Sequence, residues 1–569
     1  MKKLSKLIAG ASVFALAVVG LTACGGSGDS GSGDAASGGD PNAIISVSGC
    51  EPERPLVPGD TGETCAGDPI DVMYSGLVRL SAAGEAVNEV AESIETTDSK
   101  VFTVKLKEDW TFTDGSPVDA DSFINAWNYT ANAANAQRGS AFFDIVEGYD
   151  ALNPAQDEGE SDADYAKRVE ALAGETLKGL VKDGDYAFTI TLTAPSAMFL
   201  LRLGYTSYYP LPKTAFGADG KVTKEYGEHP ETNGPYKLDV WEHDTKISIR
   251  KDDNYKGTFV PKNGGLDFIA YAGNNMDAAL SDVQAGNLDV LGSAGGQRYK
   301  AFKDSTDIQW HVETAPQTDP IEIPYYLEHF GQDEEGALRR KAISQAIDRQ
   351  SIRDNIGDGS GTDSVAFCPK IAAISGCDQE IAGHEVLSFN EPAAKEAWAA
   401  ADAINQWNDP VLDLWYNADS GGKETYDAIV NSYVNILGIK GEAKTTPTFN
   451  ELLDLRYDFK VEGAYRAGWQ PDYPSVENFL QPMFATGGSA NTGKYSNKDF
   501  DDLISLGSGQ ATLEEANVYF TQAQELAMKD LPAIFIGDGT RKGAYSLVIK
   551  GDTIANTWKG VPNFLNLEK

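Results

Sequence analysis

Two hydrophobic periodicities interleave along this chain, and their alternation limits the fold classes open to it. Apolar and polar residues alternate in short runs such as Val101–Leu106, which is typical of half-buried strands. Elsewhere apolar residues recur at helical spacing, as Phe123, Trp127 and Ala131 do. From about residue 265 onward the two patterns take turns. The sequence therefore predicts mixed α/β lobes rather than an all-β sandwich or a helical bundle.

The expected elements can be placed by residue range. Strands are expected at Val101–Leu106, Tyr186–Leu192, Tyr236–Trp241, Ile247–Arg250, Leu266–Ala270, Val411–Tyr416 and Ala464–Trp469. Helices are expected at Asp119–Ala134, Met276–Ala285, Leu338–Asp348, Glu391–Trp407, Lys423–Leu437, Phe449–Tyr457 and Leu513–Met528. No internal repeat is visible, so a repeat architecture is not expected.

The first residues have the pattern of an export signal. Lys2, Lys3 and Lys6 precede an apolar run, Ile8–Val19, that is too short to span a bilayer comfortably. Leu21-Thr22-Ala23-Cys24 then resembles a lipobox, in which Cys24 becomes the lipidated first residue of the mature chain. We therefore predict a lipoprotein signal peptide over residues 1–23. A plain secretory signal that happens to end near a cysteine is the alternative.

Residues 24–41 are predicted to be a flexible tether. Every residue from Gly25 to Asp40 is Gly, Ser, Ala or Asp, so this segment has no apolar surface to bury. No later stretch is long and apolar enough to be a transmembrane helix, so we expect the membrane to be contacted only through the lipid anchor, on its extracytoplasmic face.

The chain has 85 acidic against 47 basic residues, a net charge of -38, which argues against nucleic acid as a partner.

The remaining cysteines are even in number, as expected for an exported protein. They are Cys50, Cys65, Cys368 and Cys377, and the economical pairing is two local disulfides, Cys50–Cys65 and Cys368–Cys377. Three connectivities are formally possible. A zinc site is the alternative, but the spacings are not CxxC and no histidine lies close to either pair. We predict no metal.

Motifs for catalysis are absent from the sequence. The five histidines are scattered, and no serine lies in a GxSxG elbow. Gly488–Lys494 fits the first seven positions of a P-loop, but Tyr495 stands where a Mg²⁺-binding Ser or Thr is needed. We therefore expect a binding protein with no cofactor, not an enzyme.

Several motifs follow one another in a fixed order along the chain. They are Tyr74–Val78, Phe102–Lys107 leading to Trp110–Pro117 and Ala120–Phe123, Asn233–Leu238 with Arg250–Tyr255, Arg339–Arg349, Ala467–Tyr473, and Tyr495–Asp501. This series resembles that of family 5 extracellular solute-binding proteins, the peptide-binding components of ABC importers. The resemblance runs from about residue 70 to 550. It implies that the protein is a monomer that binds a short peptide and passes it to an ABC transporter permease.

The resemblance also implies an architecture. The expected fold is α/β, a two-lobed periplasmic-binding-protein-like fold (type II, cluster C) with an extra inserted subdomain. Lobe I is expected to combine residues 42–98, 231–316 and 531–569, with the subdomain at 99–230 and lobe II at 317–530. Closure of the lobes on the ligand by a hinge motion follows from the same resemblance.

The resemblance assigns the binding residues. Asp472, in the motif AGWxxDY, is expected to pair with the peptide's α-amino group, and Arg466 to lie by the ligand backbone, where it can meet the ligand carboxylate. Trp469 is expected to line the cleft. The remaining candidates are Tyr473, Tyr325 and Tyr326. The alternatives are that Asp472 caps a helix beginning near Ser475, that Arg466 is a surface charge, and that Trp469 belongs to the core.

The resemblance implies a broad ligand range, because backbone pairing of an extended peptide gives affinity with little sequence preference. Gln470 stands where a known peptide binder of the family has a cysteine, and Ile321 replaces an aromatic ligand contact, so peptide length and preference stay open. A non-peptide ligand, such as an oligosaccharide or a metal chelate, is the first alternative function. A secreted hydrolase is the second.

Overall fold

The computed structural model describes residues 39–157, 159–271, 275–418 and 422–569. The predicted signal peptide over 1–23, the lipid-anchor residue Cys24 and the tether up to residue 38 lie outside the described residues. Gly39 and Asp40 hydrogen bond to the C-terminal residues Glu568 and Lys569, so the described chain begins beside its own end.

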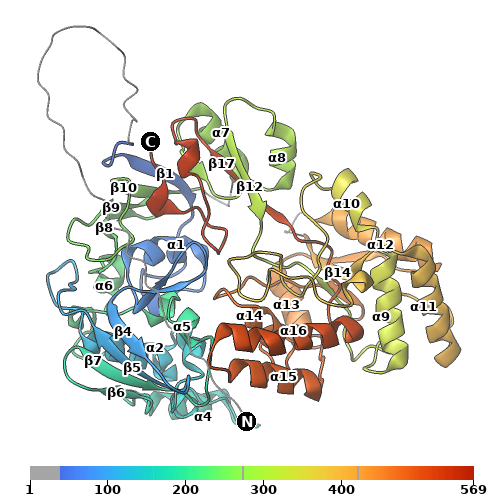
Figure 1. Ribbon diagram of the computed structural model, residues 1–569, viewed down its shortest axis with the longest axis horizontal. Helices are drawn as coiled ribbons and strands as arrows, with labels where there is room; N and C mark the ends of the chain where they lie inside the picture. The colour runs from blue at the N-terminus through green and yellow to red at the C-terminus, as the bar shows by residue number, and fades with distance from the viewer. Residues whose placement is uncertain (1–38, 158, 272–274, 419–421) are drawn as a thin grey trace, which may run out of the picture. The chain divides into compact units, whose positions relative to one another are not determined.

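A seven-stranded sheet gathers segments that are far apart in the sequence (Figure 1). Its strands, in spatial order, are β12 (Gln309–Thr314), β17 (Thr540–Tyr545), β11 (Val290–Leu291), β1 (Ile44–Gly49), β10 (Gly265–Ala270), β9 (Lys246–Lys251) and β8 (Tyr236–Glu242). β1 is parallel to both β10 and β11, whereas β17 is antiparallel to β11 and β12. Helix α7 (Met276–Ala285) packs on this sheet through Ala279, Leu280 and Val283.

A second, antiparallel sheet has the order β4 (Ala91–Glu95), β5 (Val101–Leu106), β7 (Ala187–Thr191) and β6 (Leu180–Lys182). Helix α2 (Ala120–Ala131) covers it, since the rings of Phe123 and Trp127 lie 6.0 and 5.8 Å from that of Phe188. A small hairpin, β2 (Val78–Leu80) with β3 (Ala86–Asn88), lies outside this sheet. The short helices of this part are α3 (Tyr149–Leu152), α4 (Asp162–Glu170), α5 (Phe199–Arg202) and α6 (Lys224–Glu228).

A third sheet has the order β13 (Ile321–Glu322), β16 (Ala464–Arg466), β14 (Leu414–Asn417) and β15 (Ala443–Thr446), with β14 parallel to both of its neighbours. Its core includes residues of α9, α11 and α12. The helices of this part are α9 (Glu334–Ala346), α10 (Arg349–Asn355), α11 (Glu391–Ile404), α12 (Lys423–Leu437), α13 (Phe449–Tyr457), α14 (Glu477–Phe484), α15 (Lys498–Ser508) and α16 (Leu513–Asp530). Helices α14, α15 and α16 lie together over a separate hydrophobic cluster (Figure 1).

The chain passes twice between the seven-stranded sheet and the third sheet. One crossing leads from β12 to β13 and the other from α16 to β17, and they pair where Ile321 and Ile534 exchange backbone hydrogen bonds of 2.9 and 2.8 Å. The predicted division into lobes stays a prediction. Sheet pairing places β4 with β5, and so joins strands on opposite sides of the boundary predicted at 98/99.

Most expected elements occur, and the differences lie at their ends. The predicted strand Val101–Leu106 and the predicted helices Met276–Ala285, Lys423–Leu437 and Phe449–Tyr457 have the observed bounds. The strand predicted at Ala464–Trp469 is too long, because it leaves the sheet after Arg466 and Trp469 instead bridges Thr318. The helix predicted at Asp119–Ala134 begins one residue later, because the Asp119 side chain accepts the Ser122 N–H as its N-cap.

Candidate functional site

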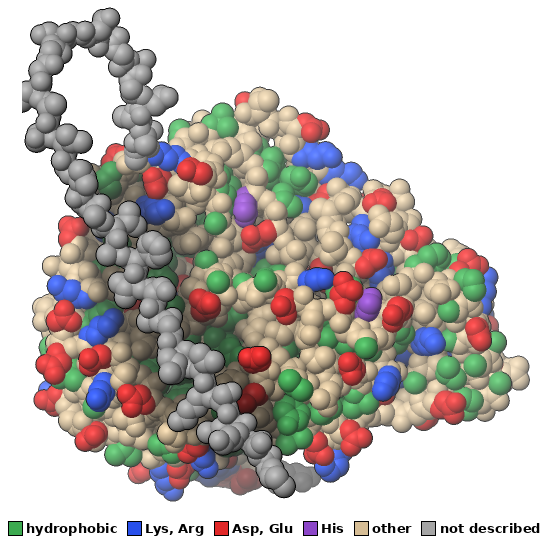
Figure 2. All heavy atoms as spheres, viewed as in Figure 1, with side chains coloured by type: hydrophobic (Ala, Val, Ile, Leu, Met, Phe, Trp, Pro, Cys, Tyr) green, Lys and Arg blue, Asp and Glu red, His purple; other side chains and the backbone are tan. Residues whose placement is uncertain are grey.

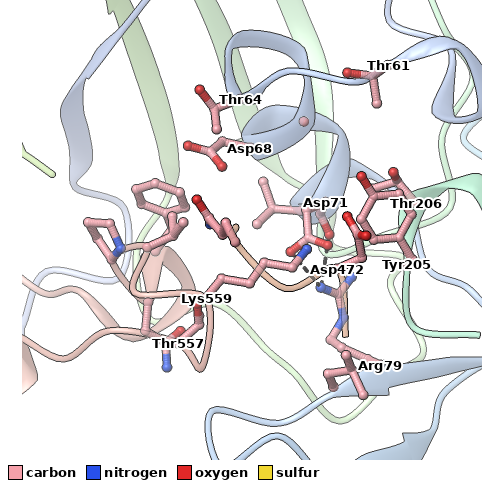
Figure 3. A pocket seen from close by; sticks show the side chains of 18 of the residues that line it. Thr61, Thr64, Asp68, Asp71, Arg79, Tyr205, Thr206, Asp472, Thr557 and Lys559 are labelled. Carbon is pink, nitrogen blue, oxygen red and sulfur yellow. Dashed lines mark hydrogen bonds and ion pairs between the residues drawn. The ribbon is translucent and has the colours of Figure 1, made fainter. Parts of the chain in front are cut away.

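A cavity of about 290 Å³ is built by segments that lie far apart in the sequence (Figure 3). One wall is α1 (Thr64–Met73), followed by residues near Arg79 at the start of the β2–β3 hairpin. Tyr205 and Thr206 form a second side, the loop Gln470–Asp472 a third, and residues between Thr557 and Leu565 a fourth. The pocket therefore brings Asp472 to parts of the chain near both ends of the described sequence.

Helix α1 presents two carboxyl groups to the pocket. Its N-terminus is held by Glu63, whose side chain accepts the N–H groups of Cys65 and Ala66, and by a disulfide that joins Cys65 to Cys50. Asp68 and Asp71 are three residues apart on this helix, which places them on one face. The structure also pairs Cys368 with Cys377, in a loop whose Ser375 hydrogen bonds to the segment after Asp472.

The two carboxyl groups of α1 differ in their partners. Asp71 accepts the hydroxyl of Tyr209 at 3.0 Å and lies 4.0 Å from the Arg79 guanidinium. Asp68 has no hydrogen bond or ion pair among the described residues, and burial raises its pKa to about 7 even though the positive charge of Lys559 opposes the shift. Asp68 is thus a carboxyl group without a fixed partner.

Asp472 faces the pocket from the loop that precedes α14. Its backbone N–H donates to Asn478 Oδ1 at 2.7 Å, and the indole Nε1 of Trp469 donates to the same oxygen at 3.3 Å. Burial raises the pKa of Asp472 to about 6, while Lys559, Arg202 and Asn478 act in the opposite direction. The N-cap of α14 is Val476 and has no side-chain cap, so the alternative of Asp472 as a helix cap has no support.

Lys559 enters the pocket from a hairpin tip near the C-terminus. Figure 3 shows its side chain extending across the pocket below Asp68, with its tip directed toward Asp71 and Asp472. Its Nζ lies 5.4 Å from the ring centre of Tyr205 and 5.5 Å from that of Trp558. Sequence reasoning did not single out Lys559, Asp68 or Asp71, since no local motif surrounds them.

Arg466 does not line this pocket. Its guanidinium donates to Asn417 Oδ1 at 3.1 Å, lies 3.6 Å from Asp319 Oδ1 and lies over the ring of Phe449. The role predicted for Arg466 at the ligand carboxylate stays a prediction that this geometry does not support. Trp469 is half-buried and packs against the cluster under α14–α16, next to the pocket but outside its lining.

The three tyrosines proposed from the sequence also lie outside the lining of the pocket. Tyr473 is buried and donates its hydroxyl to Glu477 at 2.5 Å. The ring of Tyr325 lies 3.6 Å from the Arg340 guanidinium, and its hydroxyl donates to the carbonyl of Asp530. Tyr326 is exposed and donates to the carbonyl of Val461. Each hydroxyl donates to another group of the protein, and a role for these three tyrosines in ligand binding stays a prediction.

The charges of the pocket favour a cationic group. Its lining holds four acids, Glu63, Asp68, Asp71 and Asp472, against two bases, Arg79 and Lys559. Glu63 is used as a helix cap, and Asp71 has Arg79 and Tyr209 as partners. The carboxyl groups of Asp68 and Asp472, which have no ion pair in the described part of the chain, face a single ammonium. On the outer face shown in Figure 2, acidic and basic side chains are spread out rather than gathered into one patch.

Comparison with known proteins places the chain in a family. The model of the family described as bacterial extracellular solute-binding proteins, family 5, matches residues 85–491. The chain belongs to family 5 of the bacterial extracellular solute-binding proteins. This family 5 protein is 24% identical over 492 residues to the oligopeptide-binding protein OppA of Bacillus subtilis, with 84% of each chain covered.

Solved structures show that this family 5 protein has the two-lobed α/β fold expected from its motifs. The unliganded open form of the periplasmic murein tripeptide-binding protein MppA matches with a TM-score of 0.73 at 19% identity, covering 92% of this chain and 96% of that one. Haemophilus influenzae OppA in complex with the peptide RPPGFSPFR matches with a TM-score of 0.68 at 21% identity, covering 93% and 99%. Among the described helices, none has the length and apolar character needed to cross a bilayer.

Proposed function

We propose that this family 5 protein binds short peptides in the pocket of Asp472 and delivers them to the permease of an ABC importer. The observation that carries the proposal is the Asp472 carboxyl, which faces the pocket and has no ion pair with any described residue. A peptide α-ammonium supplies the missing positive charge. The ammonium stabilises the ionised carboxylate of Asp472, because a carboxylate that is withdrawn from water without a charged partner costs free energy.

The names of the relatives support the same ligand class. The Bacillus subtilis relative is an oligopeptide-binding protein, and a Lactococcus lactis relative, 27% identical over 454 residues, is a dipeptide-binding protein. Extended peptides offer the same backbone groups whatever their side chains, so one site accepts many sequences. Asp472 would then bind the α-ammonium, the charged group that all free peptides share at their N-terminus.

Lipid anchoring at Cys24 is part of this proposal. The apolar run and the lipobox-like residues before Cys24 support it, and the residues from Gly25 to Asp40 supply the tether. Cells fed a radiolabelled fatty acid should label the wild-type protein and leave Cys24→Ala unlabelled. Equal labelling of both proteins would remove the anchor from the proposal and leave peptide binding untouched.

The proposed function is tested by comparing peptides that differ only at the amine. Native mass spectrometry of the purified protein, followed by denaturation, identifies the ligand it carries; intact peptides are expected, and cleavage products would point to a hydrolase. Isothermal titration then compares that peptide with its N-acetylated form. The wild type should prefer the free amine by about tenfold or more, since an ion pair with a buried carboxylate is lost on acetylation.

The matched variants are Asp472→Asn and Asp150→Asn. Asp472→Asn keeps the shape of the side chain but removes its charge, so it should bind both peptides with nearly equal, weak affinity. Asp150 is exposed and lies outside the pocket, so its variant should behave as the wild type. If Asp472→Asn kept the tenfold preference for the free amine, another group would be the ammonium partner.

A further inference from the structure

The hairpin tip that carries Lys559 is fixed by its own hydrogen bonds and by contacts with β17. The N–H of Thr557 donates to Val561 O and that of Gly560 to Thr557 O, each at 2.8 Å. The carbonyl of Gly560 accepts from Arg541 in β17 at 3.1 Å. Gly560 has a φ of +71°, and a Cβ there would lie 2.7 Å from the Pro316 ring, so the turn fits only glycine. The base of the Lys559 side chain is therefore positioned by the fold.

The ammonium of Lys559 has unused hydrogen-bonding capacity. Nζ carries three N–H donors, yet no carboxylate oxygen lies within 4.0 Å of it among the described residues, and no hydrogen bond from it is formed there. Nζ itself lies over the rings of Tyr205 and Trp558, which attract the cation but take up none of its donors in a hydrogen bond among the described residues. Lys559 is partly buried, and an ammonium that is partly withdrawn from water and has unused donors favours an anionic partner from outside the protein.

The other cations near the pocket are already engaged. Arg79 is buried, and it donates to the carbonyls of Asp71 at 2.9 Å and Tyr74 at 2.6 Å. Arg466 pairs with Asp319 outside the pocket. Lys559 is thus the base that lines the cavity, faces Asp472 and lacks a carboxylate or main-chain partner within the described part of the chain.

We propose, on the basis of the proposed function, that Lys559 binds the α-carboxylate of a short peptide whose ammonium is held by Asp472. The ammonium of the zwitterionic peptide would then pair with Asp472 and its carboxylate with Lys559, two residues from distant segments of the chain. A cavity of about 290 Å³ lies at the small end of the ~300–1,000 Å³ typical of ligand pockets, which suits a peptide of two or three residues. Lys559 would thereby set a preference for peptides that end in the pocket.

The test uses tri-alanine, tri-alanine amide and N-acetyl-tri-alanine as probes in isothermal titration. In the wild type, amidation of the C-terminus should weaken binding about tenfold, the value of one charge-assisted hydrogen bond. Lys559→Met keeps the apolar stem but removes the ammonium, so amidation should cost it less than twofold. Lys559→Arg keeps a cation and should retain most of the penalty.

Two charge-matched controls isolate the position of the cation. Lys498→Met removes an exposed lysine of α15 and Arg466→Met removes the arginine predicted from the sequence, and both should show the wild-type amidation penalty. Circular dichroism confirms that each variant is folded. The proposal is overturned if amidation of the peptide still weakens binding about tenfold in Lys559→Met, or no longer weakens it in Arg466→Met. It is also overturned by tighter binding of all three probes by Lys559→Met, which would make Lys559 a resident counter-ion of Asp472.

The three probes separate the role of Lys559 from peptide binding as such. If the wild type binds tri-alanine and discriminates against the N-acetyl form but not against the amide, peptide binding stands and the role of Lys559 falls. If the wild type binds none of the three probes, tripeptides are not ligands, and the assignment of Lys559 falls with them.

Discussion

The side-chain oxygen of Asn478 accepts the backbone N–H of Asp472 at 2.7 Å, and this bond ties the pocket loop to the first turn of α14. The same oxygen accepts the indole N–H of Trp469 at 3.3 Å. One amide group therefore fixes both ends of the loop that carries the candidate ammonium partner. Asn478 is a positioning residue for Asp472.

Asn478→Ala should weaken the binding of a free-amine peptide by about fivefold to tenfold, since the hydrogen bonds that hold the loop are lost. Asn478 also lowers the pKa of Asp472, so the pH midpoint of binding should move upward in the variant. Titrations between pH 5 and pH 8 measure both effects. A loss of affinity with an unchanged pH midpoint would mean that Asn478 acts only through stability.

Peptide binding by the wild type should be linked to protons. The pKa of Asp472 in the unliganded protein is about 6, and an ammonium requires the ionised form. Affinity for a free-amine peptide should therefore fall about tenfold between pH 7 and pH 5. Calorimetry near pH 6 in buffers of different ionisation enthalpy should detect the protons released. In Asp472→Asn this release should disappear, and an unchanged release would assign the titration to another group.

Asp68→Asn should stabilise the unliganded protein at high pH. The folded-state pKa of Asp68 is raised to about 7 from 3.8, so the ionised carboxylate is disfavoured in the folded state. The resulting loss of stability develops as pH rises from about 4 through 7. Above that range the variant should exceed the wild type by at most about 4 kcal/mol in the free energy of unfolding, and near pH 4 by little.

Urea unfolding of the wild type, Asp68→Asn and the surface control Asp150→Asn at pH 4, 6 and 8 measures this dependence. Only the Asp68 variant should gain stability relative to the wild type as pH rises. If the free energy of unfolding of Asp68→Asn differed from that of the wild type by the same amount at all three pH values, ionisation of Asp68 would not destabilise the folded state.

Gly84→Ala should disturb the segment next to Asp472. Gly84 lies in the β2–β3 turn with a φ of +77°, and a Cβ there would lie 2.0 Å from the carbonyl oxygen of Ala373 and 3.1 Å from Pro474. We expect a loss of about 1–3 kcal/mol in the free energy of unfolding together with weaker peptide binding. Thermal unfolding and titration measure the two effects.

Gly115→Ala is the matched control for Gly84→Ala. Gly115 has a φ of +84° but has nothing within 4 Å of its Cβ position, so it reports the cost of the backbone conformation alone, about 1 kcal/mol. If both variants lost the same stability and neither lost affinity, the contact between the Gly84 turn and the loop after Cys368 would have no part in binding.

The sequence predicted the elements better than the site. Periodicity located the strand Val101–Leu106 and the helix Lys423–Leu437 at their observed bounds, because their apolar spacing depends only on neighbouring residues. The motif around Asp472 likewise marked a residue that lines the pocket. The same reasoning placed Arg466 beside it, since the two are close in sequence. The strand ends between them, and Arg466 pairs with Asp319 instead.

Local pattern thus determined the fold class, the family motifs and one acid of the candidate site. Tertiary structure alone decided which charges face that acid. Asp68 on α1 and Lys559 on the C-terminal hairpin carry no motif. They meet in one pocket because β17, which precedes the hairpin, pairs in the same sheet as β1, which precedes α1. The physical reason is that the strength and specificity of a charged site depend on which groups share its buried space, and that depends on packing between distant segments.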